Sequence, residues 1–168
     1  VADANGIGDV FVLDRDNGQV KLVSTAAGNP GQARGGQKPA LSGDGTRVAF
    51  ASVTPGSGKL DILVRNLGTS AVTQLSSLLG GNAATADLSA PSLSDDGNAL
   101  AFVASGASLL AADGDAVADV YQLDLRTRAL VLASAEAAAA CRNPKLARSG
   151  VAVAFECGGT PVPSQAAS

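Results

Sequence analysis

The chain has 168 residues, a formal charge of −3 and only 12 Lys and Arg residues, which are scattered along it. This length suits one or two domains, and the lack of a basic stripe argues against a nucleic-acid partner. The longest mostly apolar stretch, residues 99–112, is broken by Ser and Gly and is too short to span a bilayer.

The sequence opens with Val and contains no Met. No charged-then-apolar signal segment stands at its start. We therefore expect that residue 1 is not a translation start and that the chain is a processed or excised piece of a longer product.

Short apolar segments separated by turn residues follow one another along the chain. The first two are DVFVLD at 9–14 and VKLVS at 20–24. PALS, RVAFAS, DILVRN and VTQLS come next, within 39–76, and a comparable series runs from 91 to 134. Such segments, with Gly, Asp, Asn and Pro between them, are typical of β-strands. The Ala-rich run at 134–141 is shorter than an isolated helix needs, and we interpret it as a connection with one helical turn.

Three hairpins repeat the same residues at spacings of 52 and 53 positions. The recurring set is Pro39, Leu41, Gly45, Ala49 and Phe50, then Pro91, Leu93, Gly97, Ala101 and Phe102, then Pro144, Leu146, Gly150, Ala154 and Phe155. Asp44-Gly45 and Asp96-Gly97 are hairpin-turn signals, because Gly accepts a positive φ at no steric cost. Ser42 and Ser94 sit at equivalent positions beside these turns, which indicates turn stabilisation rather than a nucleophile. Self-similarity at this period predicts a propeller or another repeat array.

All the aromatic residues fall on two positions of the repeat. One position holds Phe50, Phe102 and Phe155, and the other holds Phe11 and Tyr121, with Leu63 in the middle copy. We interpret these rings as core residues between adjacent sheets. The assignment argues against a carbohydrate-binding face, because no ring remains to stack on a sugar.

The pattern Pro-x-Leu-Ser-x-Asp-Gly, then an apolar strand ending in Ala-Phe, then Asp-Val-Phe-Val-x-Asp, resembles the TolB-like β-propeller repeat, also described as WD40-like. The resemblance runs from Asp3 to about Phe155. Gly43 and Asp95 stand where the family usually has Pro, and Ser149 replaces the Asp in the last copy. The resemblance implies a flat face of loops, a central channel, and a binding or scaffold role outside the cytoplasm.

The predicted fold is therefore all-β, with β-propeller blades of four antiparallel strands and about three blades in the chain, either half of a six-bladed propeller or a fragment of a larger one. We expect the propeller repeats to occupy residues 1–157 and an extended tail to occupy 158–168. Within the repeats, the predicted parts are an outer strand pair at 9–24, a blade at 38–76, a blade at 90–134 and an inner strand pair at 143–157.

The first and last strand pairs leave unpaired edges, and such edges invite another chain. Two copies joined head to tail would make six blades around a two-fold axis. Alternatively, the remaining blades lie on polypeptide absent from this chain, or a different protein caps an open array. We therefore expect a protein partner or a second copy that completes the propeller, with no nucleic acid and no membrane span.

No pattern for catalysis emerges from the sequence. The chain contains no His, so it cannot form a Ser-His or Cys-His pair or an imidazole metal site. A Gly-x-Ser-x-Gly elbow and a phosphate-binding glycine loop are also absent. We expect neither an enzyme nor an organic cofactor.

Two polar clusters share the spacing i, i+2, i+6: Asp3, Asn5 and Asp9, and Asp113, Asp115 and Asp119. Calcium takes six to eight oxygen ligands, often from one short loop, so both clusters are candidate calcium sites. In the middle repeat only the last acid persists, as Asp61. An Asp at this position therefore has a structural role at the turn into the strand. Hydrogen bonds from Asp and Asn side chains that stabilise the turn, without a metal, are the alternative interpretation of both clusters.

Cys141 and Cys157 lie symmetrically about Ser149, the turn of the last hairpin. Residues equidistant from a turn face each other across a two-stranded ribbon, so we expect a disulfide between them. Two unconnected small residues near a hairpin base are the alternative. A disulfide would favour an oxidising compartment, periplasmic or extracellular.

These observations favour a non-catalytic, exported protein-binding or scaffold module. The alternatives are a propeller domain of an exported peptidase-like enzyme and a structural subunit of a larger extracellular assembly.

Overall fold

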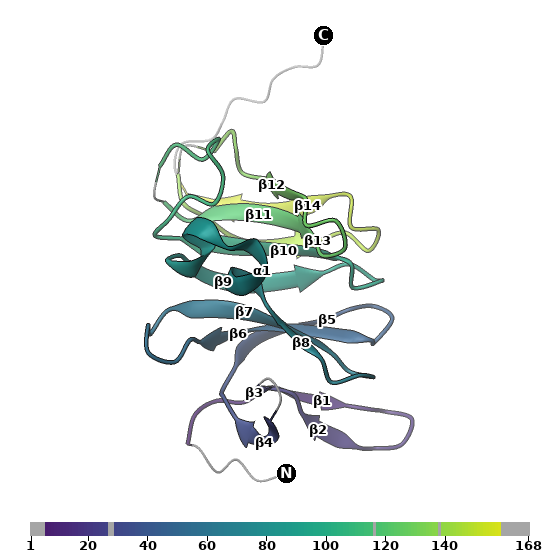
Figure 1. Ribbon diagram of the computed structural model, residues 1–168. Helices are drawn as coiled ribbons and strands as arrows, with labels where there is room; N and C mark the ends of the chain where they lie inside the picture. The colour runs from purple at the N-terminus through teal and green to yellow at the C-terminus, as the bar shows by residue number, and fades with distance from the viewer. Residues whose placement is uncertain (1–5, 27–28, 116, 138, 159–168) are drawn as a thin grey trace.

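The computed structural model describes residues 6–26, 29–115, 117–137 and 139–158, and strands dominate it (Figure 1). Antiparallel sheets stack on one another in chain order, from the N-terminal to the C-terminal end. No helix within these residues has the length and apolar character that crossing a membrane requires.

Two four-stranded sheets form the middle of the stack, and their strands follow one another in sequence order. One sheet contains β5 (Gln37–Leu41), β6 (Arg47–Val53), β7 (Leu60–Asn66) and β8 (Val72–Gln74). The other contains β9 (Asp87–Leu93), β10 (Ala99–Ser105), β11 (Asp119–Asp124) and β12 (Leu130–Leu132). The predicted blade of four antiparallel strands is thus confirmed.

Two-stranded sheets lie on either side of this pair. β1 (Phe11–Leu13) pairs with β2 (Val20–Leu22), and β13 (Cys141–Leu146) pairs with β14 (Val153–Cys157). A further short hairpin of β3 (Thr25–Ala26) and β4 (Asn29–Ala33) precedes β5. The sequence did not predict this hairpin, because its Ala, Gly, Asn and Pro content is typical of a loop.

The helical segments differ from the prediction. Helix α1 (Leu75–Leu79) and the 3₁₀ helix η1 (Gly81–Ala84) connect β8 to β9, where the sequence predicted a strand continuing to residue 76. Leu75 is fully buried, so packing of this connection competes successfully with strand pairing. The run at 134–141 is a connection, as predicted, and its described residues include a single turn with a 2.8 Å hydrogen bond from Ala137 N–H to the Ser134 carbonyl.

The inner strand of each repeat carries the same irregularity. The residue before the repeated proline has a φ of 51° to 54° in all three copies: Lys38, Ala90 and Asn143. The ladders of β5, β9 and β13 shift register at this point, as in a β-bulge. Recurrence of so unusual a backbone angle shows that the three sheets are copies of one unit.

The first two hairpin turns are stabilised by the same Ser and Asp side chains. Ser42 Oγ donates to Asp44 Oδ1 at 2.6 Å, and the Thr46 N–H donates to the same oxygen at 2.9 Å. Ser94 and Asp96 make the equivalent 2.6 Å bond. The turn-stabilising role predicted for Ser42 and Ser94 is confirmed.

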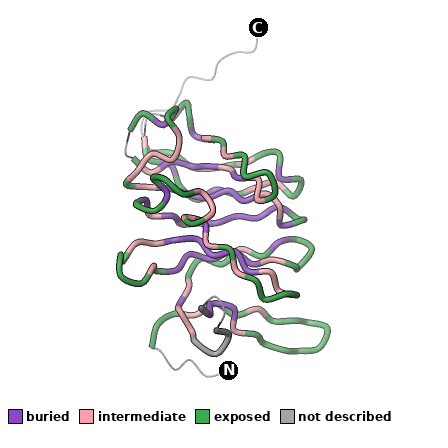
Figure 2. The backbone as a smooth tube through the Cα atoms, viewed as in Figure 1, coloured by how far each residue is buried: buried purple, intermediate pink, exposed green. Residues whose placement is uncertain are grey.

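Most of the repeated aromatic residues lie in the core, which runs along the strand centres (Figure 2). Phe50, Phe102 and Tyr121 are completely buried, and the rings of Phe102 and Tyr121 stack with centroids 5.8 Å apart. Phe155 is partly buried against the second four-stranded sheet. The prediction is wrong for Phe11, which is 40% exposed because β1 and β2 form only a two-stranded sheet.

Candidate functional site

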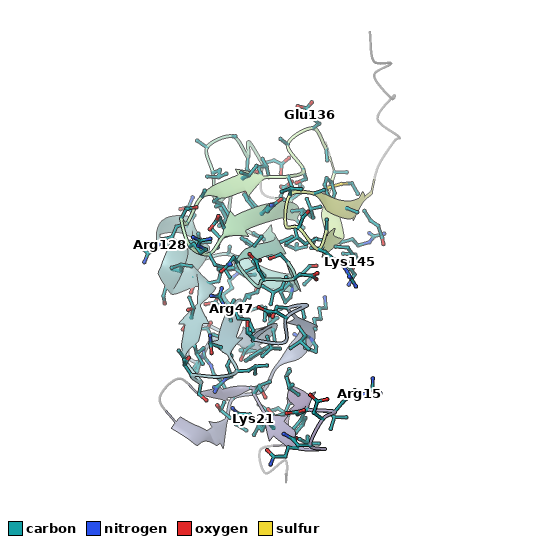
Figure 3. All side chains as sticks on the ribbon, turned by 90° about the vertical axis from the view of Figure 1, so that its right-hand side faces the viewer. Arg15, Lys21, Arg47, Arg128, Glu136 and Lys145 are labelled. Carbon is teal, nitrogen blue, oxygen red and sulfur yellow. A yellow bond between two sulfur atoms is a disulfide. The ribbon has the colours of Figure 1, made fainter. Side chains whose placement is uncertain are left out.

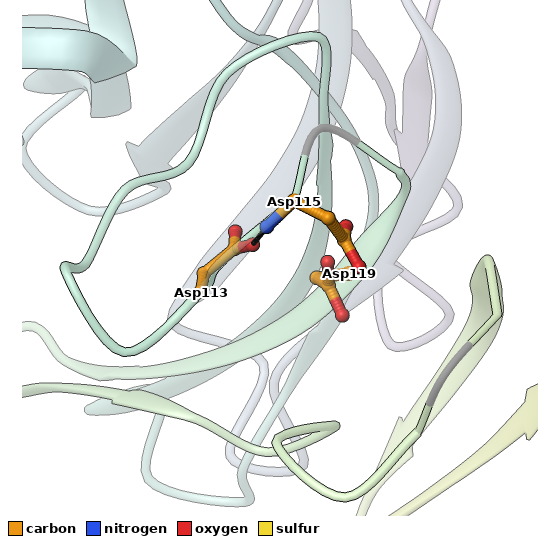
Figure 4. Close-up of side chains that lie close together, drawn as sticks. All are labelled: Asp113, Asp115 and Asp119. Carbon is orange, nitrogen blue, oxygen red and sulfur yellow. Dashed lines mark hydrogen bonds between the residues drawn. The ribbon is translucent and has the colours of Figure 1, made fainter.

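Three carboxylates lie together at the start of β11 (Figure 4). Asp113 and Asp115 belong to the loop before this strand, and Asp119 is its first residue. One oxygen from each side chain lies within 4.8 Å of the others. Oxygens that bind one calcium ion at about 2.3–2.6 Å are at most about 5 Å apart, so the cluster has a suitable span and chemistry.

The carboxylates are held in place by neighbouring donors. Asp113 accepts a hydrogen bond from the Tyr121 hydroxyl, and Asp119 accepts one from Ser134 Oγ at 2.6 Å. Asp115 is exposed and accepts the Val117 N–H at 2.9 Å. The loop is therefore organised around the carboxylates without a metal, and Asp115 is the most accessible member.

Burial and mutual repulsion make this cluster electrostatically unfavourable. Burial raises the pKa of Asp119, and the nearby carboxylates of Asp113 and Asp115 add to the increase, although the Ser134 hydrogen bond opposes it. Burial also raises the pKa of Tyr121, reinforced by its hydrogen bond to Asp113. A divalent cation bound among the carboxylates would relieve this repulsion.

The last acid of each cluster has a structural role in every copy. Asp9, Asp61 and Asp119 each accept a hydrogen bond from a serine 15 residues later: Ser24, Ser76 and Ser134 respectively. This bond ties the beginning of the third strand of a repeat to the second residue after the fourth strand, a contact that the predicted turn-capping role of these acids did not include. Asp3 and Asn5, predicted to join Asp9 in a calcium site, lie outside the described residues.

The last hairpin contains the predicted disulfide. Cys141 and Cys157 are directly paired residues of β13 and β14, and their sulfur atoms are bonded. The symmetric placement of the two cysteines about the turn was sufficient to identify the pair.

Sequence reasoning missed a cavity of about 250 Å³ between the segment before β1, the start of β5 and the end of β6. Its polar side chains come from Arg34, Gln37 and Ser52, and two of them, Arg34 and Ser52, have buried polar atoms without a hydrogen-bond partner among the described residues. Both depart from the repeat: at the 52-residue offset the next copy has Ala86 and Ala104. A position-by-position comparison of the copies would have revealed this departure.

Comparison with known proteins shows the fold. No protein-family model matches the chain, and no curated protein matches it. Among solved structures, TolB from Acinetobacter baumannii is similar over 88% of this chain and 31% of its own, with a TM-score of 0.56 and 20% identity. The chain folds as part of a TolB-like β-propeller.

Other propeller-containing structures are similar in the same way. The tricorn protease matches over 82% of this chain and 12% of its own length, with a TM-score of 0.54 and 13% identity. The chain thus spans about a third of TolB and a smaller part of the protease. At these identities the likeness establishes the TolB-like propeller fold and not a shared activity.

Proposed function

We propose that the chain is a non-catalytic, exported protein-binding or scaffold module, whose two-stranded sheets are completed by strands of another polypeptide segment. The observation that supports this most directly is the exposure of Phe11. Its repeat counterparts, Leu63 and Tyr121, are 1% and 0% exposed, whereas Phe11 is 40% exposed.

The difference follows from strand pairing. β7 and β11, the counterparts of β1, each pair with a strand on both sides, whereas within the described residues β1 pairs only with β2. β14 is the counterpart of β6 and β10, the strands that cover β7 and β11. Joining β14 of one copy to β1 of another would therefore reproduce the pairing of the complete sheets, and a parent chain could supply equivalent strands.

The disulfide supports the exported part of this proposal. Disulfides persist in the periplasm and outside the cell, and they are rare in the cytosol, where thiols are kept reduced. The Cys141–Cys157 bridge joins the two ends of the last hairpin, so we infer that this disulfide has a structural role.

The similarity to the tricorn protease favours a second candidate function. In that reading, the same sheets belong to a propeller domain of an exported peptidase-like enzyme, and the parent chain covers Phe11. A structural subunit of a larger extracellular assembly is the third candidate, in which the sheet edges join many copies.

Light scattering during size-exclusion chromatography tests the proposal. We expect the wild-type chain to form a discrete dimer and Phe11→Asp to be monomeric. Val131→Asp is the matched control, because Val131 is 59% exposed on the outer strand of a complete sheet. Open polymers would favour the assembly subunit. A wild-type monomer would exclude the second copy, and hydrogen exchange of β1 in a longer parent form would then decide whether the parent covers it.

A further inference from the structure

The cavity beside Arg34 and Ser52 contains buried polar groups without protein partners. Ser52 is 98% buried, since its exposure is 2%, and its Oγ has no hydrogen-bond partner among the described residues. The Nε of Arg34 is buried and is likewise without a partner there. Buried polar atoms in folded proteins almost always have a partner, so two orphans lining one cavity indicate that something other than the protein binds there.

The strand geometry directs Ser52 into this space. Along β6, Val48 and Phe50 pack toward the first strand pair, in one cluster with Val10 and Val23. Side chains two residues apart share a face of a strand, so Ser52 points to the same side. It reaches the cavity just beyond Phe50, where the segment before β1 crosses the start of β5.

The backbone around the cavity is closely packed. The Gly36 N–H donates to the Gly8 carbonyl at 2.8 Å. A Cβ at Gly35, whose φ is 78°, would lie 2.6 Å from Ile7 Cδ1. The positive φ favours glycine at this position, and Ile7 lies beside it as part of an apolar wall with Val53.

The fold itself does not require the two polar side chains. The equivalent positions of the next repeat hold Ala86 and Ala104, which are 2% and 1% exposed in an intact sheet. Replacing a small apolar residue by a buried hydroxyl or a guanidinium is unfavourable unless a partner compensates for the lost hydration. Arg34 makes no ion pair with any carboxylate of the described residues.

The missing partner must be an acceptor. Arginine Nε can only donate, and a serine hydroxyl can donate as well. An anionic oxygen is preferred beside a guanidinium, and a carboxylate presents two oxygens in the matching planar arrangement. The volume is equivalent to roughly eight water molecules at about 30 Å³ each, which is enough for a carboxylate on a few carbon atoms.

We propose that this cavity binds a carboxylate carried on a short aliphatic group. Arg34 and Ser52 donate to the carboxylate oxygens, and Ile7 and Val53 contact the aliphatic part. The ligand is either a free small acid or the C-terminal residue of a peptide with a small apolar side chain. This site goes beyond the proposed module function and does not depend on how Phe11 is covered.

An NMR titration of the ¹⁵N-labelled chain with sodium isobutyrate tests the proposal. We expect saturable shifts at Gly8, Gly35 and Gly36, with a Kd of about 1 mM, which is ordinary for so small a ligand. The neutral isostere isobutyramide should not bind. Ser52→Ala and Arg34→Gln should each weaken binding about tenfold or more, because hydrogen bonds to a charged group are lost.

Controls separate the site from general effects. Arg15→Gln removes a charge at the exposed turn of the β1–β2 hairpin (Figure 3), and Arg15 does not line the cavity, so this variant should bind as wild type does. Ser52→Ala copies the residue of the next repeat, so its spectrum outside the cavity should be unchanged. The titration is repeated on Phe11→Asp, so that failure of the assembly proposal does not affect this result.

A peptide arm distinguishes the two sources of the carboxylate. Acetyl-Ala-Val with a free C-terminus is compared with its amidated form. Tighter binding of the free peptide than of isobutyrate assigns the site to a chain end, and binding of isobutyrate alone assigns it to a free acid. Equal binding of acid and amide, unsaturable shifts, or unchanged binding by both variants would overturn the proposal and leave ordered water as the partner.

Discussion

The sheet of β9–β12 and the pair of β1–β2 have the same local pattern but different burial. Tyr121 on β11 is completely buried, whereas Phe11, at the same repeat position on β1, is 40% exposed. Both strands pair with the outer strand that follows them, and within the part of the chain that the structure describes only β11 also pairs with an inner neighbour. Burial of the repeated ring therefore depends on the strand that precedes it in the sheet.

The Asp–Ser hydrogen bonds form whether or not the preceding inner strand is present. Ser24 Oγ donates to Asp9 at 2.7 Å, and Ser134 Oγ donates to Asp119 at 2.6 Å. Each serine oxygen also accepts a backbone N–H at 3.0 Å, from Val10 and Val120 respectively. These contacts join two consecutive strands, so a pair of strands is sufficient to form them.

The largest expected effect is the difference in stability between removing a buried ring and removing the partly exposed ring of Phe11. We expect Phe102→Ala to lower the free energy of unfolding by about 3–5 kcal/mol, because it opens a space in the core between complete sheets. Phe11→Ala should lower it by less than about 1 kcal/mol in the monomer, since that ring is only partly covered. Urea unfolding measures both. Equal losses would contradict the comparison.

The second prediction contrasts the two terminal hairpins, of which only β13–β14 is covalently closed. The bridge spans 16 residues, and closing a loop of about that length stabilises a fold by about 3 kcal/mol. Reduction should lower the free energy of unfolding by that order, and it should increase the rate of proteolysis at β13–β14 more than at β1–β2. Cys141→Ala combined with Cys157→Ala should be insensitive to reductant, and an unfolding midpoint unaffected by reduction in wild type would contradict the prediction.

The third prediction concerns the carboxylate loop, which is present before β11 and reduced to Asp61 before β7. If the site has a Kd of about 1 mM, calcium at about 10 mM stabilises the folded chain by about 1.4 kcal/mol. We expect calcium to raise the melting temperature of wild type and not of Asp115→Asn, which retains the buried hydrogen bonds of Asp113 and Asp119. The same concentration of magnesium is the control, and an unchanged wild-type melting temperature would remove the calcium assignment.

The smallest expected effect compares the turns of the hairpins. The Ser94 hydroxyl, together with the Asn98 N–H, lowers the pKa of Asp96 to about 2, and the Ser42 hydroxyl lowers that of Asp44. A lowered pKa stabilises the fold above the unfolded value of about 3.9, and this contribution disappears as the pH falls toward about 2. The last hairpin has Ala147 and Ser149 at these positions and lacks the effect.

Asp96→Asn should therefore flatten the dependence of unfolding free energy on pH between about 4 and 2, relative to wild type. Urea unfolding at a series of acidic pH values measures the slope. A variant slope equal to that of wild type would show that the turn does not contribute to acid sensitivity.

Much of the fold could be predicted because its determinants are local. Asp-Gly turns, alternating apolar segments and a symmetric cysteine pair act within a hairpin, and the structure contains each of them. The helix at Leu75–Leu79 was missed, because burial of Leu75 against neighbouring sheets decides it and that contact is distant in sequence. The cavity was missed because it forms only when Ile7 and Gly8, before β1, pack against the start of β5 and the end of β6.

By itself, the sequence determined the repeating unit, its turns with their stabilising serines, and the disulfide, because each depends on residues close along the chain or at a fixed repeat spacing. Only the tertiary structure decided which copies of the ring are buried, how the three carboxylates of the β11 loop meet, and that two donors line a cavity. These features depend on packing between sheets, where the surroundings of a residue come from segments that its own sequence neighbourhood does not contain.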